Sequence, residues 1–342
     1  FKMARGVFAG ASAGEIEAVF GNMTANPEEM TFWMIIVVLL SFGICSLGLQ
    51  KGVEKITKIM MTSLLAVMIV LVIRAVTLPG AAAGLAFYLK PDFSKMTENG
   101  LFESIFAAMG QSFFTLSIGI GSMAIFGSYI SKDRSLTGES VSILALDTFV
   151  ALMSGLIIFP ACFAFGVNPD SGPKLVFVTL PNIFNEMPGG RIWGALFFIF
   201  MSFAAMSTII AVFENIISYA IDLWNWPRKK AVLVNIVLII VLSVPCVLGF
   251  NVWSGFQPLG AGSNLMDLED FIVSNNLLPL GSLVYLLFCV SRYGWGWNNF
   301  LAEANEGEGM KFPKWIRVYV TYILPMSVLF IFVQGYIGKF FS

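Results

Sequence analysis

Apolar residues form long continuous runs, separated by shorter polar stretches. A helix that crosses a bilayer needs about 20 predominantly apolar residues. Eight runs meet that length, at roughly 32–49, 57–79, 101–130, 140–165, 192–222, 231–250, 271–291 and 316–338. They lack the alternating ~10-residue segments of a transmembrane β-barrel. The pattern therefore predicts an all-α, polytopic membrane protein with eight transmembrane helices.

The run at 101–130 differs from the others, because Gly110 to Ser122 carries glycines, hydroxyls and an amide where a lipid-facing helix would carry Leu or Val. In hydrocarbon an unpaired backbone group is costly, so a weakened helix is tolerated only beside protein or a water-filled cavity. Two interpretations stay open: an interrupted helix that lines a binding site, or a small-residue helix that packs closely on a neighbour.

The loops predict the orientation, because short loops rich in Lys and Arg stay in the cytoplasm. Alternate connections hold most of these charges, namely Lys51, Lys55, Lys58, Lys132, Arg134, Arg228, Lys229, Lys230, Lys311, Lys314 and Arg317. The connections between them are mainly acidic and face outside, with Lys90, Lys95, Lys174 and Arg191 against Asp92, Glu98, Asp170, Glu186, Asp267, Glu269 and Asp270.

Two outer connections, 79–100 and 166–191, are long and rich in Pro and Gly. They are predicted to be extracellular loops, acting either as lids or as ordinary connections. Residues 1–31 are predicted to be the end of a helix followed by an exposed loop. Because the sequence opens at Phe1 and shows no signal-peptide pattern, we expect an amino-terminal piece to precede it.

Composition narrows the functional class. Only 12% of residues are charged, against roughly 25% in soluble domains, so the chain is an integral membrane protein. The net charge of −1 gives no reason to expect nucleic-acid binding. Histidine, the commonest metal ligand and general base, is absent, which argues against most hydrolases and metalloenzymes and predicts a protein that is not an enzyme. The four cysteines are predicted to be free, buried thiols.

Asp147 lies about a third of the way into the run at 140–165, between apolar neighbours. A carboxylate at membrane depth is expensive and commonly marks a substrate or ion path. We expect it to face a polar partner or a cation, with the hydroxyls and amide of Gly110 to Ser122 as companions. A structural role, such as capping a break in a neighbouring helix, remains open.

A second polar cluster, Ala204 to Thr208, lies in the run at 192–222, with Glu214 further along. Adjacent Ser and Thr can bond back to carbonyls one turn earlier and be purely structural. Hydroxyls and helix carbonyls are also hard oxygen ligands that suit an alkali cation. Glu214 is either an interhelical strut or a functional group, while Asp222 and Asp270 lie at the ends of their runs.

Together these residues resemble the bacterial branch of the neurotransmitter:sodium symporters, which carry amino acids or related amines with Na⁺. The resemblance covers nearly the whole chain and rests on Gly110 to Gly121 with Gly127-Ser128-Tyr129, on Arg74 to Ala81, on Tyr88 to Phe93 and on Ala204 to Thr208. It implies an inverted-repeat fold with discontinuous helices. The eight runs would then be spans four to eleven, with the first two spans and most of the third missing from a partial, single transporter domain over 1–342.

The resemblance also implies roles for individual residues. Substrate-lining positions fall on Phe114, Ser117, Ile120 and Val212. The first sodium site takes Thr115 and Asp147, and the second takes the Ala204 carbonyl with the Ser207 and Thr208 hydroxyls.

Gating and chloride positions complete the implied set. Asp270 fits the outer gate, and Asp222 with Tyr129 fits the cytoplasmic gate. Where the family often has Asn, Asp147 implies a chloride-independent type whose carboxylate, with Gln111 close by, supplies the negative charge.

The leading hypothesis is a sodium-coupled secondary symporter of amino acids or related small amines, working by alternating access in the bacterial inner membrane. Its partners would be Na⁺, a small amino acid-like solute and the bilayer, without an organic cofactor. Phe114, Ile120 and Val212 favour a hydrophobic or aromatic solute. The alternatives are a transport-incompetent fragment or paralogue that acts as a regulatory subunit, and a proton-coupled transporter of the same fold in which Asp147 titrates.

Overall fold

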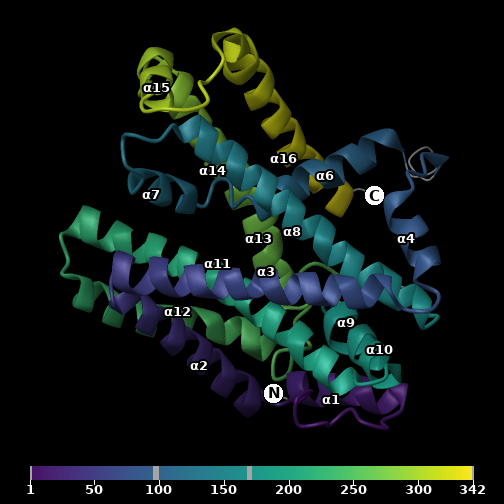
Figure 1. The fold of residues 1–342 in the computed structure, drawn as a ribbon. Coiled ribbons are helices and arrows are strands. Elements are labelled where there is room, and N and C mark those ends of the chain that lie inside the picture. The colour runs from purple at the N-terminus through teal and green to yellow at the C-terminus, as the bar shows by residue number, and fades with distance from the viewer. Residues whose placement is uncertain (1, 95–99, 168–171, 341–342) are drawn as a thin grey trace. The chain divides into compact units, whose positions relative to one another are not determined.

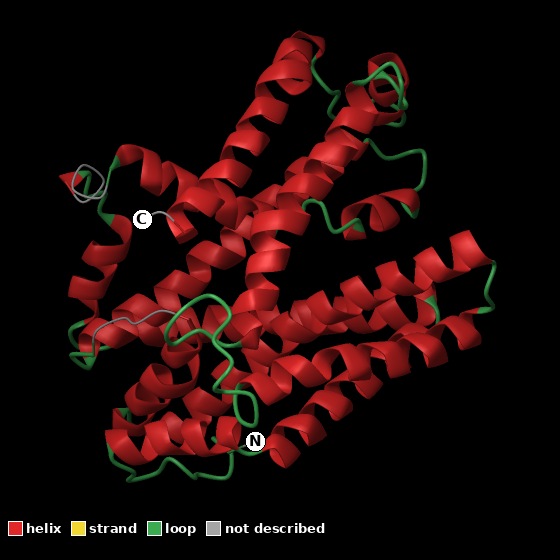
Figure 2. Cartoon of the chain, turned by 180° about the vertical axis from the view of Figure 1, so that it is seen from behind, coloured by secondary structure: helices red, strands yellow, loops and turns green. Residues whose placement is uncertain are grey.

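A computed structural model describes residues 2–94, 100–167 and 172–340, and the regular structure of these residues is helical (Figures 1 and 2). This confirms the predicted all-α class. Within the described residues, seven helices are long and apolar enough to cross a membrane, at Pro27–Ser46, Gly52–Val76, Leu136–Ala164, Gly190–Trp224, Arg228–Gly249, Leu265–Val290 and Lys314–Phe340. Each matches one predicted run, with ends that differ by a few residues.

The eighth predicted span, 101–130, is not one continuous helix. It consists of α6 (Leu101–Thr115) and α7 (Ser122–Ser128), joined by a non-helical stretch. Neither piece alone is long enough to cross a bilayer. A count of eight spans is therefore not confirmed, because the glycine-rich sequence interrupts this run.

The segment before the first span departs from prediction. Instead of an exposed loop it holds α1 (Ala13–Ala25), which begins with a capping box. The Ser12 amide donates to the Glu15 carboxylate over 2.8 Å, and the Ser12 hydroxyl accepts from the Glu15 amide. The Ser12 hydroxyl also donates to the Glu15 carboxylate over 2.8 Å, and the two bonds to that carboxylate, from the amide first and then from the hydroxyl, lower the pKa of Glu15. A capping box needs only a Ser or Thr and, three residues later, a Glu or Gln, a signal that a search for apolar runs does not detect.

The two long outer connections are also partly helical. Residues 79–100 include α4 (Ala81–Leu89), and 166–191 include α9 (Gly172–Lys174), the π-turn η2 (Leu175–Thr179) and α10 (Leu180–Glu186). Lys95, Glu98 and Asp170, which entered the orientation argument, lie outside the described residues.

The chain divides into two compact units. The first comprises Phe1–Pro91 with Val150–Phe256, and the second comprises Asp92–Phe149 with Gln257–Ser342. Helix α8 (Leu136–Ala164) contributes its residues before Val150 to the second unit and the remainder to the first.

The first unit is built around α11 (Gly190–Trp224), a helix of 35 residues. Helices α2 (Pro27–Ser46), α3 (Lys55–Val76) and α12 (Arg228–Gly249) pack against it (Figure 1). A short π-helical segment, η1 (Leu49–Glu54), leads from α2 into α3. The core comprises large apolar side chains from α1, α3, α10 and α11, among them Ile16, Leu64, Met68, Ile183 and Phe197.

The second unit holds the broken helix, the spans Leu265–Val290 and Lys314–Phe340, and α15 (Trp297–Ala304). The first of these spans runs through α13 (Leu265–Ile272), the π-turn η3 (Val273–Leu277) and α14 (Leu278–Val290). The second runs through η4 (Lys314–Ile316), η5 (Tyr319–Ile323) and α16 (Leu324–Phe340). Leu278, Val328 and Ile331 pack with Phe113 of α6 in the core.

Two predicted cytoplasmic connections of the second unit are fastened together, and we call residues 131–135 with 304–311 the clasp. The Glu308 amide donates to the Asp133 carbonyl over 2.9 Å, and the Ser135 amide donates to the Glu308 carbonyl over 3.2 Å. The buried Ser135 hydroxyl donates to the Met310 carbonyl, and Lys132 pairs with Glu306 at 3.4 Å. The Ser131 hydroxyl donates to the Asp133 carboxylate and lowers the pKa of that carboxyl.

Gly307→Ala should open the clasp. Gly307 has a φ of +76°, and a Cβ there would come within 2.7 to 2.8 Å of the Asp133 and Arg134 backbone. We expect a loss of about 1–3 kcal/mol of stability, typical of overpacking, and faster hydrogen exchange at the Ser135 and Glu308 amides. Exchange mass spectrometry and thermal unfolding measure both effects.

Gly138→Ala is the matched control, because its Cβ would make only ordinary contacts, at 3.8 Å or more, with the same region. Equal exchange in the two variants would contradict the close backbone contact at Gly307.

Candidate functional site

The centre of the candidate site is the break between α6 and α7. Helix α6 ends at Thr115, and α7 begins after Gly121. Between them Ser117 has a φ of 51°, and Gly119 and Gly121 have φ values of 92° and 94°. A positive φ is uncommon for a residue with a side chain, and such strain often accompanies a functional site. The structure thus supports the interrupted-helix interpretation of Gly110 to Ser122.

Helix α14 covers one side of the break. A Cβ on Gly119 would collide with the Leu278 carbonyl and the Ser282 amide, and a Cβ on Gly281 would collide with the Gly119 carbonyl. Glycine is therefore required at 119 both by the positive φ and by the close approach of α14. Protein packing, rather than lipid, surrounds this part of the irregular backbone, as membrane burial demands.

Thr115 and Asp147 meet directly beside the break. The Thr115 hydroxyl lies 3.0 and 3.1 Å from the two carboxylate oxygens of Asp147 and donates to them. Asp147 is half-buried within α8. This is the polar companion predicted for Asp147, and it brings together the two residues expected at the first sodium site. Three hard oxygens gathered in this way match the ligand preference of an alkali cation.

A cleft of about 850 Å³ lies within the second unit along α6. Of the predicted site residues, it is lined by Gln111, Phe114 and Asp270. Phe114 is 55% exposed, so its ring is available to a ligand. The remaining two substrate positions on the break, Ser117 and Ile120, are half-buried, and Ile120 packs against the Phe113 and Leu278 core.

The predicted second sodium site lies on α11 in the first unit. The Ser207 and Thr208 hydroxyls donate to the Ala204 carbonyl over 2.8 and 3.3 Å. This is the back-bonded arrangement that a structural role requires. It also gathers three oxygens, and each hydroxyl keeps lone pairs with which it can accept or coordinate.

Val212 is placed one turn beyond Thr208. Both residues line a groove of about 580 Å³ in the first unit, together with apolar residues of α2 and α12. The two predicted cytoplasmic-gate residues lie at helix ends: Tyr129 directly follows α7 and is 42% exposed, and Asp222 is exposed in the last turn of α11.

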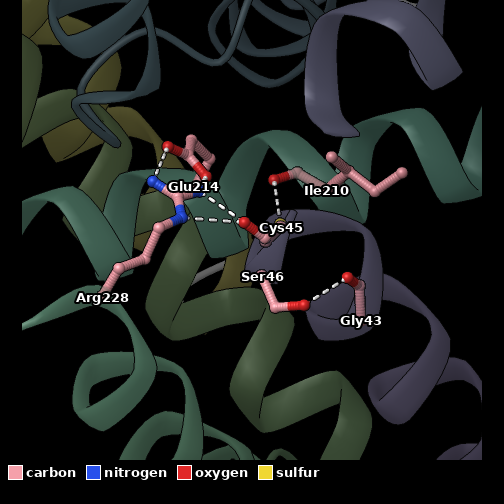
Figure 3. A network of polar contacts seen from close by, with 6 residues as sticks. All are labelled: Gly43, Cys45, Ser46, Ile210, Glu214 and Arg228. Atoms are coloured by element: carbon pink, nitrogen blue, oxygen red, sulfur yellow. Dashed lines mark hydrogen bonds and ion pairs between the residues drawn. The ribbon is translucent and has the colours of Figure 1, made fainter. Parts of the chain in front are cut away.

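Glu214 is an interhelical strut. It is fully buried, and the guanidinium of Arg228, at the start of α12, donates two hydrogen bonds of 3.1 and 2.5 Å to its carboxylate (Figure 3). The same guanidinium donates twice to the Cys45 carbonyl near the end of α2, over 2.9 and 2.6 Å. The Cys45 thiol in turn donates to the Ile210 carbonyl of α11. One arginine thus joins three helices.

Several polar residues of these sites were not singled out from the sequence. Asn275 and Gln334 line the 850 Å³ cleft. Ser122, by contrast, belongs to the stretch already singled out; it is buried at the start of α7, and its hydroxyl has no hydrogen-bond partner among the described residues. Arg228 was counted only as a loop charge. A polar side chain near the end of an apolar run was the available signal for each, but its partners depend on tertiary packing.

Comparison with known proteins now decides the family. A model of the sodium:neurotransmitter symporter family matches residues 18–340. The chain belongs to the sodium:neurotransmitter symporter family. It is a multi-pass membrane protein of a transporter family and not an enzyme.

Relatives within the symporter family are found in bacteria and beyond. The chain is 32% identical over 336 residues to the uncharacterized sodium-dependent transporter YhdH of Bacillus subtilis (strain 168), covering 97% of this chain and 72% of the relative. It is 34% identical to an uncharacterized sodium-dependent transporter of Haemophilus influenzae, covering 91% and 66% of the two chains. For a third, MJ1319 of Methanocaldococcus jannaschii, these values are 29%, 87% and 58%.

Among solved structures, MhsT in complex with L-phenylalanine matches with a TM-score of 0.83 at 36% identity. The match covers 98% of this chain and 74% of MhsT. The symporter chain described here therefore spans between about three-fifths and three-quarters of the proteins it matches.

Glu214→Ala should be strongly destabilising, because it leaves the Arg228 guanidinium with only the Cys45 carbonyl. Breaking a buried ion pair costs about 3–5 kcal/mol. Lys132→Ala is the control, since the Lys132–Glu306 pair has side chains that are 79% and 42% exposed and should contribute less than about 1 kcal/mol. Thermal unfolding in detergent compares the two, and equal shifts would rule out a special role for the buried pair.

Proposed function

We propose that this chain forms part of a secondary active symporter that couples Na⁺ entry to the uptake of an amino acid-like solute by alternating access. The single observation that carries the proposal is the Thr115–Asp147 contact at the break between α6 and α7. The family assignment supports the use of sodium.

Physical chemistry supports this role for an interrupted helix. A charged solute and Na⁺ at the bilayer midplane need oriented dipoles and oxygen ligands in place of water, and unwound backbone supplies both. Thr115 and Asp147 would bind one Na⁺, and Ala204, Ser207 and Thr208 a second. If ion and solute favour the same conformation, each raises the affinity for the other by the same factor.

The solute is proposed to be a hydrophobic or aromatic amino acid. Phe114 and Ile120 would supply apolar walls, and Ser117 a polar contact. That MhsT was solved with L-phenylalanine supports this class of solute. Asp270 would close the outer side, while Tyr129 and Asp222 would serve the cytoplasmic gate. The seven long helices and the broken one would correspond to spans four to eleven of the family fold.

Uptake of radiolabelled L-phenylalanine into proteoliposomes that contain the complete protein tests the proposal. Uptake should require an inward Na⁺ gradient and exceed that in equimolar K⁺. Equal uptake in the two salts would overturn sodium coupling, and the absence of uptake for all apolar amino acids would overturn the proposed solute class.

Asp147→Asn should raise the Na⁺ concentration for half-maximal uptake by about tenfold or more, which corresponds to about 1.4 kcal/mol, or make uptake dependent on chloride. The physical reason is that the substitution removes the negative charge beside the proposed ion while keeping an oxygen ligand. Na⁺ titrations with chloride or gluconate as the anion measure both effects.

Glu139→Gln is the control, because it removes a carboxylate from the same helix at its exposed end, where Glu139 pairs with Arg134. Unchanged uptake by Asp147→Asn in chloride-free buffer would contradict the charge-compensation role.

A further inference from the structure

The span that carries Asp270 is not a regular α-helix. Between α13 and α14 it contains the π-turn η3, in which the Leu278 amide donates to the Val273 carbonyl five residues back. An extra residue in one turn rotates the preceding helix by roughly 100° relative to the following one, since a turn holds 3.6 residues. Asp270, at the end of α13, therefore points in a direction that depends on this turn.

A neighbouring helix stabilises the π-turn. The Asn276 side-chain amide donates to the Phe271 carbonyl, five residues earlier in the span, over 3.2 Å. The Tyr336 hydroxyl of α16 donates to the Asn276 side-chain oxygen over 2.5 Å. The Tyr336 ring also packs edge-to-face on Phe271 at 5.3 Å.

The Asp270 carboxylate is fixed from the same turn. The Ser274 hydroxyl donates to it over 2.9 Å. Both residues line the 850 Å³ cleft, which also receives Gln111, Phe114 and, from α16, Gln334. Asp270 is the only acidic residue among the described residues that line this cleft. Ser274, which orients its carboxylate, belongs to η3, the same turn that Tyr336 contacts through Asn276.

We propose that Tyr336 and Asn276 are positioning residues, which hold η3 so that the Asp270 carboxylate is directed into the cleft. The gating role of Asp270 rests on the proposed function. The direction in which its carboxylate points does not, because it can be measured without transport. Tyr336 would act through its hydroxyl, which donates to Asn276. Substitution by Phe removes this hydrogen bond and keeps the ring contact with Phe271.

The test measures the electrostatic potential in the cleft. In the complete protein with its cysteines replaced by serine, Gln334→Cys places one thiol in the cleft. Its reaction rates with a cationic (trimethylammonium-ethyl) and an anionic (sulfonatoethyl) methanethiosulfonate report the local charge. Asp270→Asn should lower the cation-to-anion rate ratio by about two- to tenfold, and Tyr336→Phe should lower it in the same direction.

Two further variants keep the result decisive. Asn276→Ala should reproduce the Tyr336→Phe change, whereas Tyr322→Phe, on the same span and 66% exposed, should leave the ratio unchanged. In the Asp270→Asn background Tyr336→Phe should have no further effect. An unchanged ratio in Tyr336→Phe, or effects of Tyr336→Phe and Asp270→Asn that simply multiply, would overturn the proposal.

Transport supplies an independent reading. If the proposed function holds, Tyr336→Phe should lower the maximal uptake rate by about two- to tenfold while the thermal midpoint stays that of Tyr322→Phe. If the wild-type protein showed no sodium-driven uptake, the proposed function would be wrong. The positioning of Asp270 by Tyr336 and Asn276 would still be tested by the rate ratios.

Discussion

A membrane helix can be interrupted only where something other than lipid satisfies its backbone. This constraint explains much of the second unit. At the break after Thr115, glycines allow α14 to approach until its backbone touches that of Gly119. At η3 the carbonyl of Phe271 is satisfied by the Asn276 side chain. Both irregularities lie beside polar side chains of the candidate site, so the same departures from regular helix supply its shape and its hydrogen-bonding groups.

In the first unit the corresponding constraint is that a buried charge must have a partner. Glu214 is fully buried, and an unpaired carboxylate there would be prohibitively expensive. Arg228 satisfies both carboxylate oxygens and also the Cys45 carbonyl at the end of α2. A cation at a helix C-terminus is favourable as well, because the last carbonyls lack partners within the helix. Glu214 follows Thr208 on α11 by about two turns. The segment that carries Ala204, Ser207 and Thr208 is therefore linked to α2 and α12 at Glu214.

The sequence predicted the features that local chemistry determines. Run lengths predicted the seven long helices, and Gly110, Gly119 and Gly121 left an interruption of the eighth run as one of two interpretations. The break falls at Gly119 and Gly121, whereas Gly110 lies within α6. Asp147 was expected to find a hydroxyl partner, and Thr115 is that partner. The sodium and solute roles stay predictions, resting on the resemblance and now on the family assignment.

Features that depend on tertiary packing were not predictable. No local pattern reveals that Arg228 reaches Glu214 and Cys45, or that Tyr336 reaches Asn276. The π-turns were not predictable either: η5 is mostly apolar, and the three polar residues of η3, Ser274 to Asn276, do not by themselves indicate a π-turn. The clasp joins side chains and backbone groups up to 175 residues apart, such as Ser135 and Met310. Two segments that hydropathy treats as separate cytoplasmic loops therefore share one set of steric requirements, and their evolution should be coupled: an insertion or a bulky residue in either would have to be accommodated by the other.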